Sequence, residues 1–165
     1  MGSQPIDDSF DPLSFITKLN EAGISYLLIG SIAAAMHDIP IGSADYDFWV
    51  RPSDRDLVYN LTADCALSGA YRAEDRRPQD TFTDGELAKI DFFFVQEFAN
   101  EEKNIRLTFD DAYARSLLKR DNDGSFEVRI PTLDDLISMK NILAELRPDQ
   151  IRQLEYLMAK KDRAL

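Results

Sequence analysis

Two acidic side chains alternate with aromatic ones in the segment 44–50, which reads ADYDFWV. In an extended strand, residues i and i+2 project from one face. Asp45 and Asp47 are therefore expected to point one way, while Tyr46 and Phe48 point the other way into a packed layer. Neighbouring carboxylates in apolar surroundings repel each other and resist ionisation unless a positive group lies between them. The segment predicts a buried strand whose acidic face requires a cation.

A third acid has the same setting. Asp91 stands between Ile90 and Phe92 in the apolar run 89–95, KIDFFFV. If this strand lies beside the first, the three carboxylates converge on one patch. Carboxylate oxygens suit Mg²⁺ (or Mn²⁺), and a pair of such ions can clamp the two oxygens of a phosphoryl displacement. We expect Asp45 and Asp47 to hold metal, and Asp91 to ligate a second metal or to act as a general base.

The pair Gly30-Ser31 lies upstream, where an apolar strand (25–30) gives way to a small-residue helix (31–38). Free backbone N–H groups and the helix dipole favour an anion at such a junction. Glycine allows a phosphate to approach the backbone closely, and the Ser31 hydroxyl can donate to it. A triphosphate bound at this turn would present its oxygens to metals held by Asp45 and Asp47.

The rest of the chain predicts an α/β (α+β) fold with a mixed, twisted sheet flanked by helices. We expect one domain over 1–165, with a core at about 24–130 and a C-terminal helical segment at about 132–163. The expected helices are 12–22, 31–38, 54–68 and 133–146, followed by an amphipathic C-terminal helix. The expected strands are 25–30, 44–50, 71–75, 80–84 and 87–95, with a hairpin over 117–130.

Bulk composition narrows the function classes. The net charge of −11 disfavours general nucleic-acid coating, because phosphate affinity comes from clustered Lys and Arg. Cys65 is the single cysteine, which excludes an intrachain disulfide and a cysteine-based metal site. Apolar runs are too short for a membrane span, and the N-terminus has no signal-peptide core, so a cytoplasmic location is expected.

Taken together, the motifs resemble a known signature. It consists of apolar-Gly-[Gly/Ser], a spacer, Asp-apolar-[Asp/Glu]-apolar, and a later acid between apolar residues. Here it reads I-G-S, thirteen residues (32–44), D-Y-D-F, and I-D-F. The chain resembles the nucleotidyltransferase-fold superfamily, which includes DNA polymerase beta. It is most similar to small bacterial members: minimal, abortive-infection toxin-type and lincosamide-type nucleotidyltransferases. The C-terminal run from 128, VRIPTLDDLISMKNILAELRPDQIRQLEYL, resembles the closing segment of these chains.

The resemblance implies a metal-dependent transfer of NMP from an NTP to a hydroxyl acceptor on tRNA, a protein or a small molecule. It assigns Gly30 and Ser31 to the triphosphate, and Asp45 and Asp47 to the metals, with Asp91 as the third acid. Lys140, in SMK, matches a lysine that in toxin-type members contacts the nucleotide or supports catalysis. An antitoxin is a further possible partner in that context.

The chain departs from related sequences at three places. Ile41 stands where an arginine often precedes the D-x-D motif, and Gln150 and Gln153 replace acids in the tail. These changes keep an alternative open, namely a catalytically silent nucleotide-binding or interaction module of a toxin–antitoxin pair. Nucleotide binding without turnover would favour that alternative.

Overall fold

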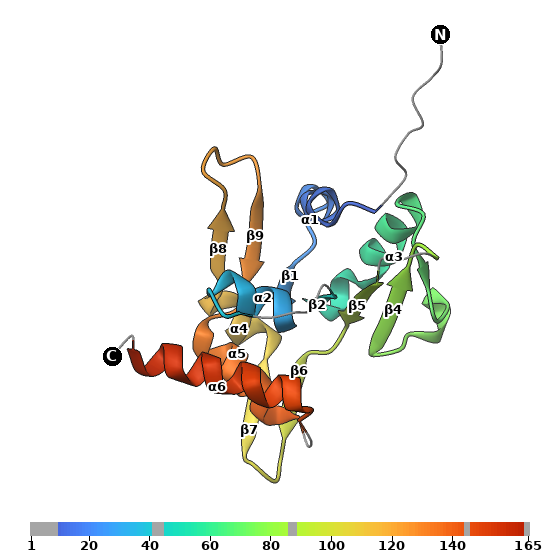
Figure 1. The fold of residues 1–165 in the computed structure, drawn as a ribbon. Helices are drawn as coiled ribbons and strands as arrows, with labels where there is room; N and C mark the ends of the chain where they lie inside the picture. The colour runs from blue at the N-terminus through green and yellow to red at the C-terminus, as the bar shows by residue number, and fades with distance from the viewer. Residues whose placement is uncertain (1–9, 41–44, 86–88, 144–145, 164–165) are drawn as a thin grey trace.

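The computed structural model describes residues 10–40, 45–85, 89–143 and 146–163 (Figure 1). Within these ranges there are six helices: α1 (Pro12–Glu21), α2 (Gly30–Met36), α3 (Arg55–Asp64), α4 (Phe109–Arg115), α5 (Leu133–Ile142) and α6 (Pro148–Arg163). The strands are β1 (Tyr26–Ile29), β2 (Tyr46–Val50), β3 (Ser68–Gly69), β4 (Gln79–Thr83), β5 (Lys89–Phe93), β6 (Glu97–Asn100), β7 (Ile105–Thr108), β8 (Leu117–Arg120) and β9 (Glu127–Ile130). Short 3₁₀ turns occupy Pro52–Asp54 and Ala73–Asp75.

A five-stranded mixed sheet in the order β1-β2-β5-β4-β3 forms the centre of the molecule. Strands β2 and β5 are parallel, and the other neighbouring pairs are antiparallel. Two further two-stranded ribbons, β6-β7 and β8-β9, extend from the central sheet (Figure 1). The predicted fold class is confirmed.

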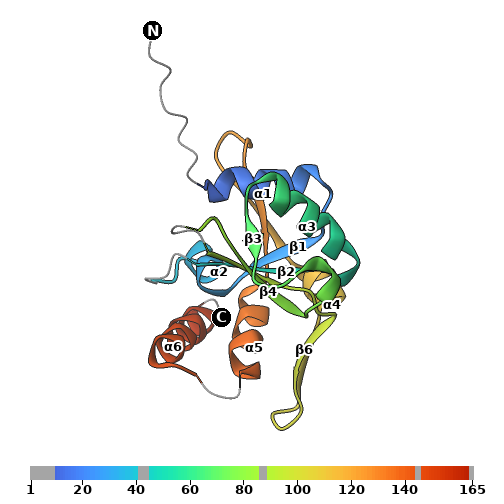
Figure 2. The ribbon, with the colours of Figure 1, turned by 90° about the vertical axis from the view of Figure 1, so that its right-hand side faces the viewer.

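The two faces of the sheet are covered by different elements. Because side chains alternate along β2 and β5, neighbouring residues of each strand lie on opposite faces. Phe48 and Phe92 lie on the face covered by α1 and α3, where their rings stack with centroids 5.4 Å apart. Trp49 and Phe93 lie on the opposite face, in a second cluster with α4 and the β6-β7 ribbon. Figure 2 shows α5 and α6 on the side of the sheet away from α1 and α3.

Several predicted elements are observed with small shifts in their ends. Helix α1 begins as expected from Asp11, whose side chain accepts a hydrogen bond from Leu13 N (3.1 Å), and Thr132 caps α5 in the same way. Strand β2 begins at Tyr46 rather than at 44. The expected continuation of α5 over 144–145 and the position of Ile41 lie outside the described residues.

Other expectations were wrong or incomplete. The segment 71–75 is not a strand, because Ala73–Asp75 forms a 3₁₀ turn closed by Arg76 in the left-handed region (φ 46°). Helix α3 ends at Asp64, four residues early, and its chain continues into β3. The segment 97–115, for which no element was predicted, forms β6, β7 and α4. Across the described ranges, no helix has the length and apolar character needed to cross a bilayer.

The alternation along β5 gives a stability prediction. Phe92 is fully buried and contacts four other aromatic rings, those of Phe15, Phe48, Phe82 and Phe94. Phe92→Ala should lower the free energy of unfolding by about 3 kcal/mol or more, because the rings around it cannot collapse into the space. Chemical denaturation measures this loss.

The neighbouring Phe93 is the matched control. It is half-buried and lines a cavity on the opposite face, so part of the truncated volume adds to space that is already open. Phe93→Ala should cost less than half as much as Phe92→Ala. Equal losses for the two variants would contradict the assignment of these residues to differently packed faces.

Candidate active site

Asp47 and Asp91 stand directly opposite each other on adjacent parallel strands. The β2-β5 register pairs Asp47 with Asp91, with Phe48 paired to Phe92 behind them. The Asp91 side chain is only 15% exposed, and its Oδ1 accepts a hydrogen bond from Thr81 Oγ1 on β4 (2.5 Å). Lys89 Nζ lies 3.8 Å from the other oxygen, Oδ2. Three neighbouring strands therefore hold this acid pair in place.

The acid pair is electrostatically unfavourable as it stands. Burial, together with the nearby Asp91 and Asp45 carboxylates, raises the pKa of the Asp47 carboxyl to about 7, whereas the Lys140 ammonium opposes the shift. A raised pKa means that the ionised form of Asp47 is poorly accommodated, because burial and the neighbouring carboxylates outweigh the opposing effect of the Lys140 ammonium. The geometry creates a place where positive charge is stabilising.

Asp45 lies just before β2 and is exposed, and its charge still reaches Asp47. No three His, Cys, Asp or Glu side chains within the described ranges form a group that could hold a metal ion. The structure thus brings two of the three predicted acids, Asp47 and Asp91, side by side. A pair of carboxylates fits Mg²⁺ or Mn²⁺, since Mg²⁺ takes one or two protein carboxylates and completes its shell with waters and phosphates. The metal roles of all three acids stay a prediction.

Gly30 joins β1 to α2 directly against Asp47. The β1-β2 register pairs the preceding residue, Ile29, with Asp47. Gly30 has φ +70°, and a Cβ atom built on it would collide with Asp47 Oδ2. Both the left-handed backbone and the close approach require glycine here. This turn therefore brings the backbone at Gly30 against the Asp47 carboxylate, and the role of Gly30 in binding a triphosphate stays a prediction.

Ser31 follows at the start of α2, and its hydroxyl has a partner that the sequence did not reveal. Gln153 Nε2, on α6, donates a hydrogen bond to Ser31 Oγ (2.8 Å). A serine hydroxyl that accepts in this way keeps its own hydrogen available for another acceptor.

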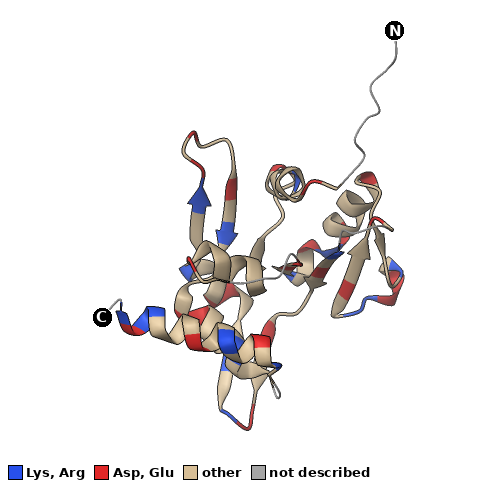
Figure 3. Cartoon of the chain, viewed as in Figure 1, with Lys and Arg blue, Asp and Glu red and all other residues tan. Residues whose placement is uncertain are grey.

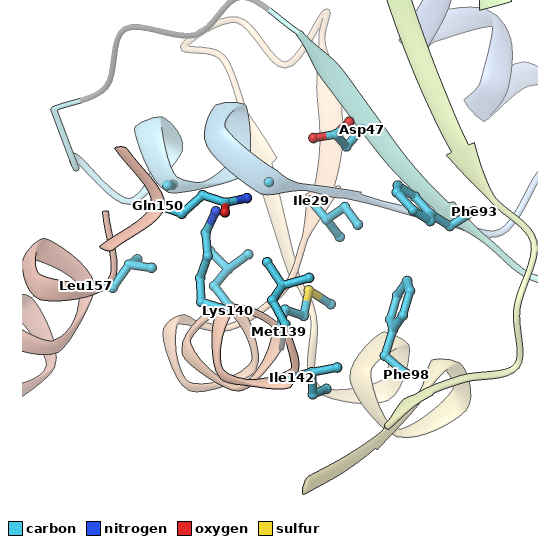
Figure 4. A pocket seen from close by; sticks show the side chains of 13 residues that line it. Ile29, Asp47, Phe93, Phe98, Met139, Lys140, Ile142, Gln150 and Leu157 are labelled. Atoms are coloured by element: carbon cyan, nitrogen blue, oxygen red, sulfur yellow. The ribbon is translucent and has the colours of Figure 1, made fainter. Parts of the chain in front are cut away.

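Beside the acid pair, a cavity of about 220 Å³ opens between the sheet, β6, α5 and α6 (Figure 4). Its lining is mostly apolar and includes Ile29, Phe93, Phe98, Met139, Ile142 and Leu157. The polar side chains on its wall are Asp47, Lys140 and Gln150. Figure 4 shows Asp47 on one side of this space and the ends of Lys140 and Gln150 close together on the other.

Lys140 comes from α5 and is the predicted lysine of the SMK motif. Burial lowers the pKa of its ammonium, while the Asp47 and Asp149 carboxylates act in the opposite direction. Its charge is therefore held in a partly desolvated position that faces the acid pair across the cavity. An ammonium in such a position binds an anion more strongly than one exposed to water.

Sequence reasoning missed three contributors to this site. Thr81 orients Asp91, but only the β4-β5 register, which pairs Thr81 with Asp91, reveals it. Phe98 belongs to β6, for which no strand was predicted. Gln153 was noticed as a replaced acid, and its contact with Ser31 spans 122 residues, beyond the reach of any local pattern.

Comparison with known proteins finds a likeness in the overall fold. No family model and no curated protein sequence matches the chain. The structure is similar to the crystal structure of the lincosamide antibiotic adenylyltransferase LnuA with lincomycin bound, at a TM-score of 0.64. The match covers 89% of this chain and 94% of LnuA, at 10% sequence identity. The chain shares the overall fold of that adenylyltransferase structure. At this identity the likeness concerns the fold alone.

The raised pKa of Asp47 predicts how stability depends on pH. An unfolded Asp titrates at about 3.9, and in the folded chain the Asp47 carboxyl titrates at about 7. Between these values the folded chain keeps a proton that the unfolded chain has lost, so this group's contribution to stability falls as pH rises from about 4 to about 7. Asp47→Asn removes that loss. In the presence of EDTA, the variant should unfold about 3 °C or more above the wild type at pH 8, and at a similar temperature at pH 4.

Glu155→Gln provides the control for net charge, because it removes one negative charge from an exposed position on α6. Thermal unfolding of both variants across pH 4 to 8 makes the comparison. An equal gain in Glu155→Gln at pH 8 would assign the effect to the overall charge of −11 and not to the buried pair.

Proposed function

We propose that the chain is a metal-dependent nucleotidyltransferase that moves NMP from an NTP to a hydroxyl acceptor. The observation that carries the proposal is the pairing of Asp47 with Asp91 next to the Gly30 turn. A carboxylate pair in which the pKa of Asp47 is raised, beside the positive-φ turn at Gly30, suits a metal ion bound together with a phosphate. The nucleotidyltransferase fold supports the same reading.

In this proposal the acids bind metal and the Gly30-Ser31 turn binds phosphate. Asp47 and Asp91, with Asp45 at the edge, would hold Mg²⁺ or Mn²⁺, which supplies charge neutralisation of the phosphates and the leaving group when bound. Gly30 and Ser31 would contact the triphosphate through backbone N–H and hydroxyl groups. The acceptor hydroxyl attacks the α-phosphorus and pyrophosphate leaves. Asp91, oriented by Thr81, would either share the metal or take the hydroxyl proton.

Lys140 would balance the charge of the bound phosphates from the far side of the cavity. Its stem passes along apolar lining residues, and its charge faces Asp47. Held in this way, the ammonium reaches an anion bound at the Gly30 turn without having to shed a full shell of water on binding. In this proposal Lys140 is one of the nucleotide-binding residues, the role that the resemblance of the SMK motif implies.

The cavity favours a small acceptor over an RNA. Its walls are largely apolar, which suits a compact molecule with an apolar body and a reactive hydroxyl. Acidic residues are spread over the elements of the chain (Figure 3). The basic cluster at the end of α6 is partly engaged within the chain, since Lys160 bonds Asp38 (3.3 Å) and Lys161 bonds Asp134 (2.9 Å). An RNA backbone needs free cations that such pairs do not offer.

The direct test is incubation of the protein with labelled NTPs and Mg²⁺ in three separate arms. One arm contains lincomycin and related small hydroxylated molecules, one contains total RNA, and one contains cell protein. We expect label transfer in the first arm, and its loss by more than about 100-fold in Asp45→Asn and Asp91→Asn. Asp64→Asn, at an exposed position of α3, is the matched control and should keep full activity.

Each outcome of this assay assigns a function. Transfer to RNA or to protein would retain the chemistry and replace the acceptor. Full activity of Asp91→Asn would contradict the acid-pair mechanism. Nucleotide binding in calorimetry without release of pyrophosphate in any arm would favour the silent nucleotide-binding module.

Lys140 gives a second prediction in which binding and stability separate. Lys140→Met keeps the stem and removes a partly desolvated charge, so the unfolding temperature should stay the same or rise. NTP affinity should fall by about 10-fold or more, since a hydrogen bond to a charged group contributes about 1.5–3 kcal/mol. Lys161→Met, which removes an exposed charge on α6, should leave the affinity unchanged. Calorimetric titration with NTP and Mg²⁺ measures both, and unaltered affinity in Lys140→Met would remove this residue from the site.

A further inference from the structure

Helix α6 lies close to α2 (Figure 2). Its side chains form hydrogen bonds at both ends of α2. Gln153 Nε2 donates to Ser31 Oγ at the beginning of α2 (2.8 Å). Two turns later, Lys160 Nζ donates to the carbonyl oxygen of His37 at the end of α2, and lies 3.3 Å from Asp38 Oδ2. The bonded residues are 122 or 123 positions apart at both ends, so the two helices advance in step.

Gln153 is an unusual choice of residue for its position. Its side chain is 7% exposed, and its amide oxygen, Oε1, is buried without a hydrogen-bond partner among the described residues. One turn further along α6, the equivalent inward position is occupied by Leu157, which is fully buried. A buried polar atom without a partner is destabilising, and an apolar side chain would pack here without that penalty. The bond to Ser31 is the interaction that only the amide provides.

We infer that Gln153 is a positioning residue that sets the direction of the Ser31 hydroxyl for the nucleotide. This inference rests on the proposed function, in which Ser31 contacts the triphosphate. A hydroxyl has one hydrogen to donate and two lone pairs that accept. With Gln153 donating into one lone pair, the hydrogen of Ser31 is directed to another acceptor, and a bound phosphate oxygen is that acceptor. The hydroxyl is thus oriented before the nucleotide arrives, which lowers the entropy lost on binding.

The same geometry explains why an amide, and not a carboxylate, suits this position in the present chain. An ionised Glu at 153 could only accept, so Ser31 would donate its hydrogen to that carboxylate. The hydroxyl would then have no hydrogen left for a phosphate, and a negative charge would lie beside the anion. Gln153→Glu is therefore a nearly isosteric change that reverses the hydrogen bond and is more damaging than simple truncation.

A double-mutant cycle on NTP affinity tests the inference. Binding of NTP with Mg²⁺ is measured by calorimetry for the full chain, for Ser31→Ala, for Gln153→Ala and for the double variant. We expect each single change to weaken binding about 3- to 10-fold, and Gln153→Ala to add no further loss when Ser31 is already Ala. If the truncated variant does not fold, Gln153→Met, which preserves the volume and lacks the donor, replaces it.

Two controls separate positioning from general support of α6. Lys160→Met removes the bond at the other end of α2 and should leave NTP affinity within about twofold of the wild type. Ala159→Glu adds a charge at an exposed position of the same helix and should do the same, whereas Gln153→Glu should weaken binding more than Gln153→Ala.

Three results would overturn the inference: additive losses in the cycle, unchanged affinity in Gln153→Ala, or an equal loss in Lys160→Met. Failure of the unaltered chain to bind any NTP is a different result. It would refute the proposed function, and this inference with it.

Discussion

The parallel pairing of β2 with β5 is the constraint on which the rest of the structure depends. It places Asp47 against Asp91 on one face and stacks Phe48 on Phe92 on the other. Since side chains alternate along a strand, a slip of one residue would put an acid among the aromatic rings and a ring beside an acid. The aromatic core therefore fixes the register that places the two carboxylates side by side. The favourable packing on the hydrophobic face of the sheet offsets the unfavourable electrostatics on the other face.

The elements around the acid pair accommodate the two neighbouring carboxylates. Gly30 lets the β1–α2 connection approach Asp47 more closely than any residue with a Cβ would allow. Helix α5 brings the ammonium of Lys140 into the mostly apolar lining of the cavity, where it partly offsets the negative charge of Asp47. Unfavourable local features of this kind are tolerated where a ligand supplies what is missing.

The sequence predicted the parts of this site that depend on local pattern. The apolar flanks of Asp45, Asp47 and Asp91, the Gly30-Ser31 junction and the cap at Thr132 follow from alternation, backbone freedom and hydrogen-bond chemistry within a few residues. Thr81 and Gln153 could not be found in that way, because a strand register and a helix contact across 122 residues bring them to the site. The misassigned segment 71–75 failed for a related reason, since strand-like composition did not reveal the left-handed Arg76 that ends the turn.

The hydrogen bonds at the two ends of α2 determine where α6 packs more than how strongly it packs. Apolar contacts such as those of Leu157 tolerate sliding of one helix along another, because they depend on area and not on direction. Polar bonds at two points with a nearly constant offset do not tolerate it, and a shift of one turn would break both. The hydrogen bonds of Gln153 and Lys160 thus select one position of α6 along α2. Helix α6 thereby determines how the distant turn at Gly30 and Ser31 is completed.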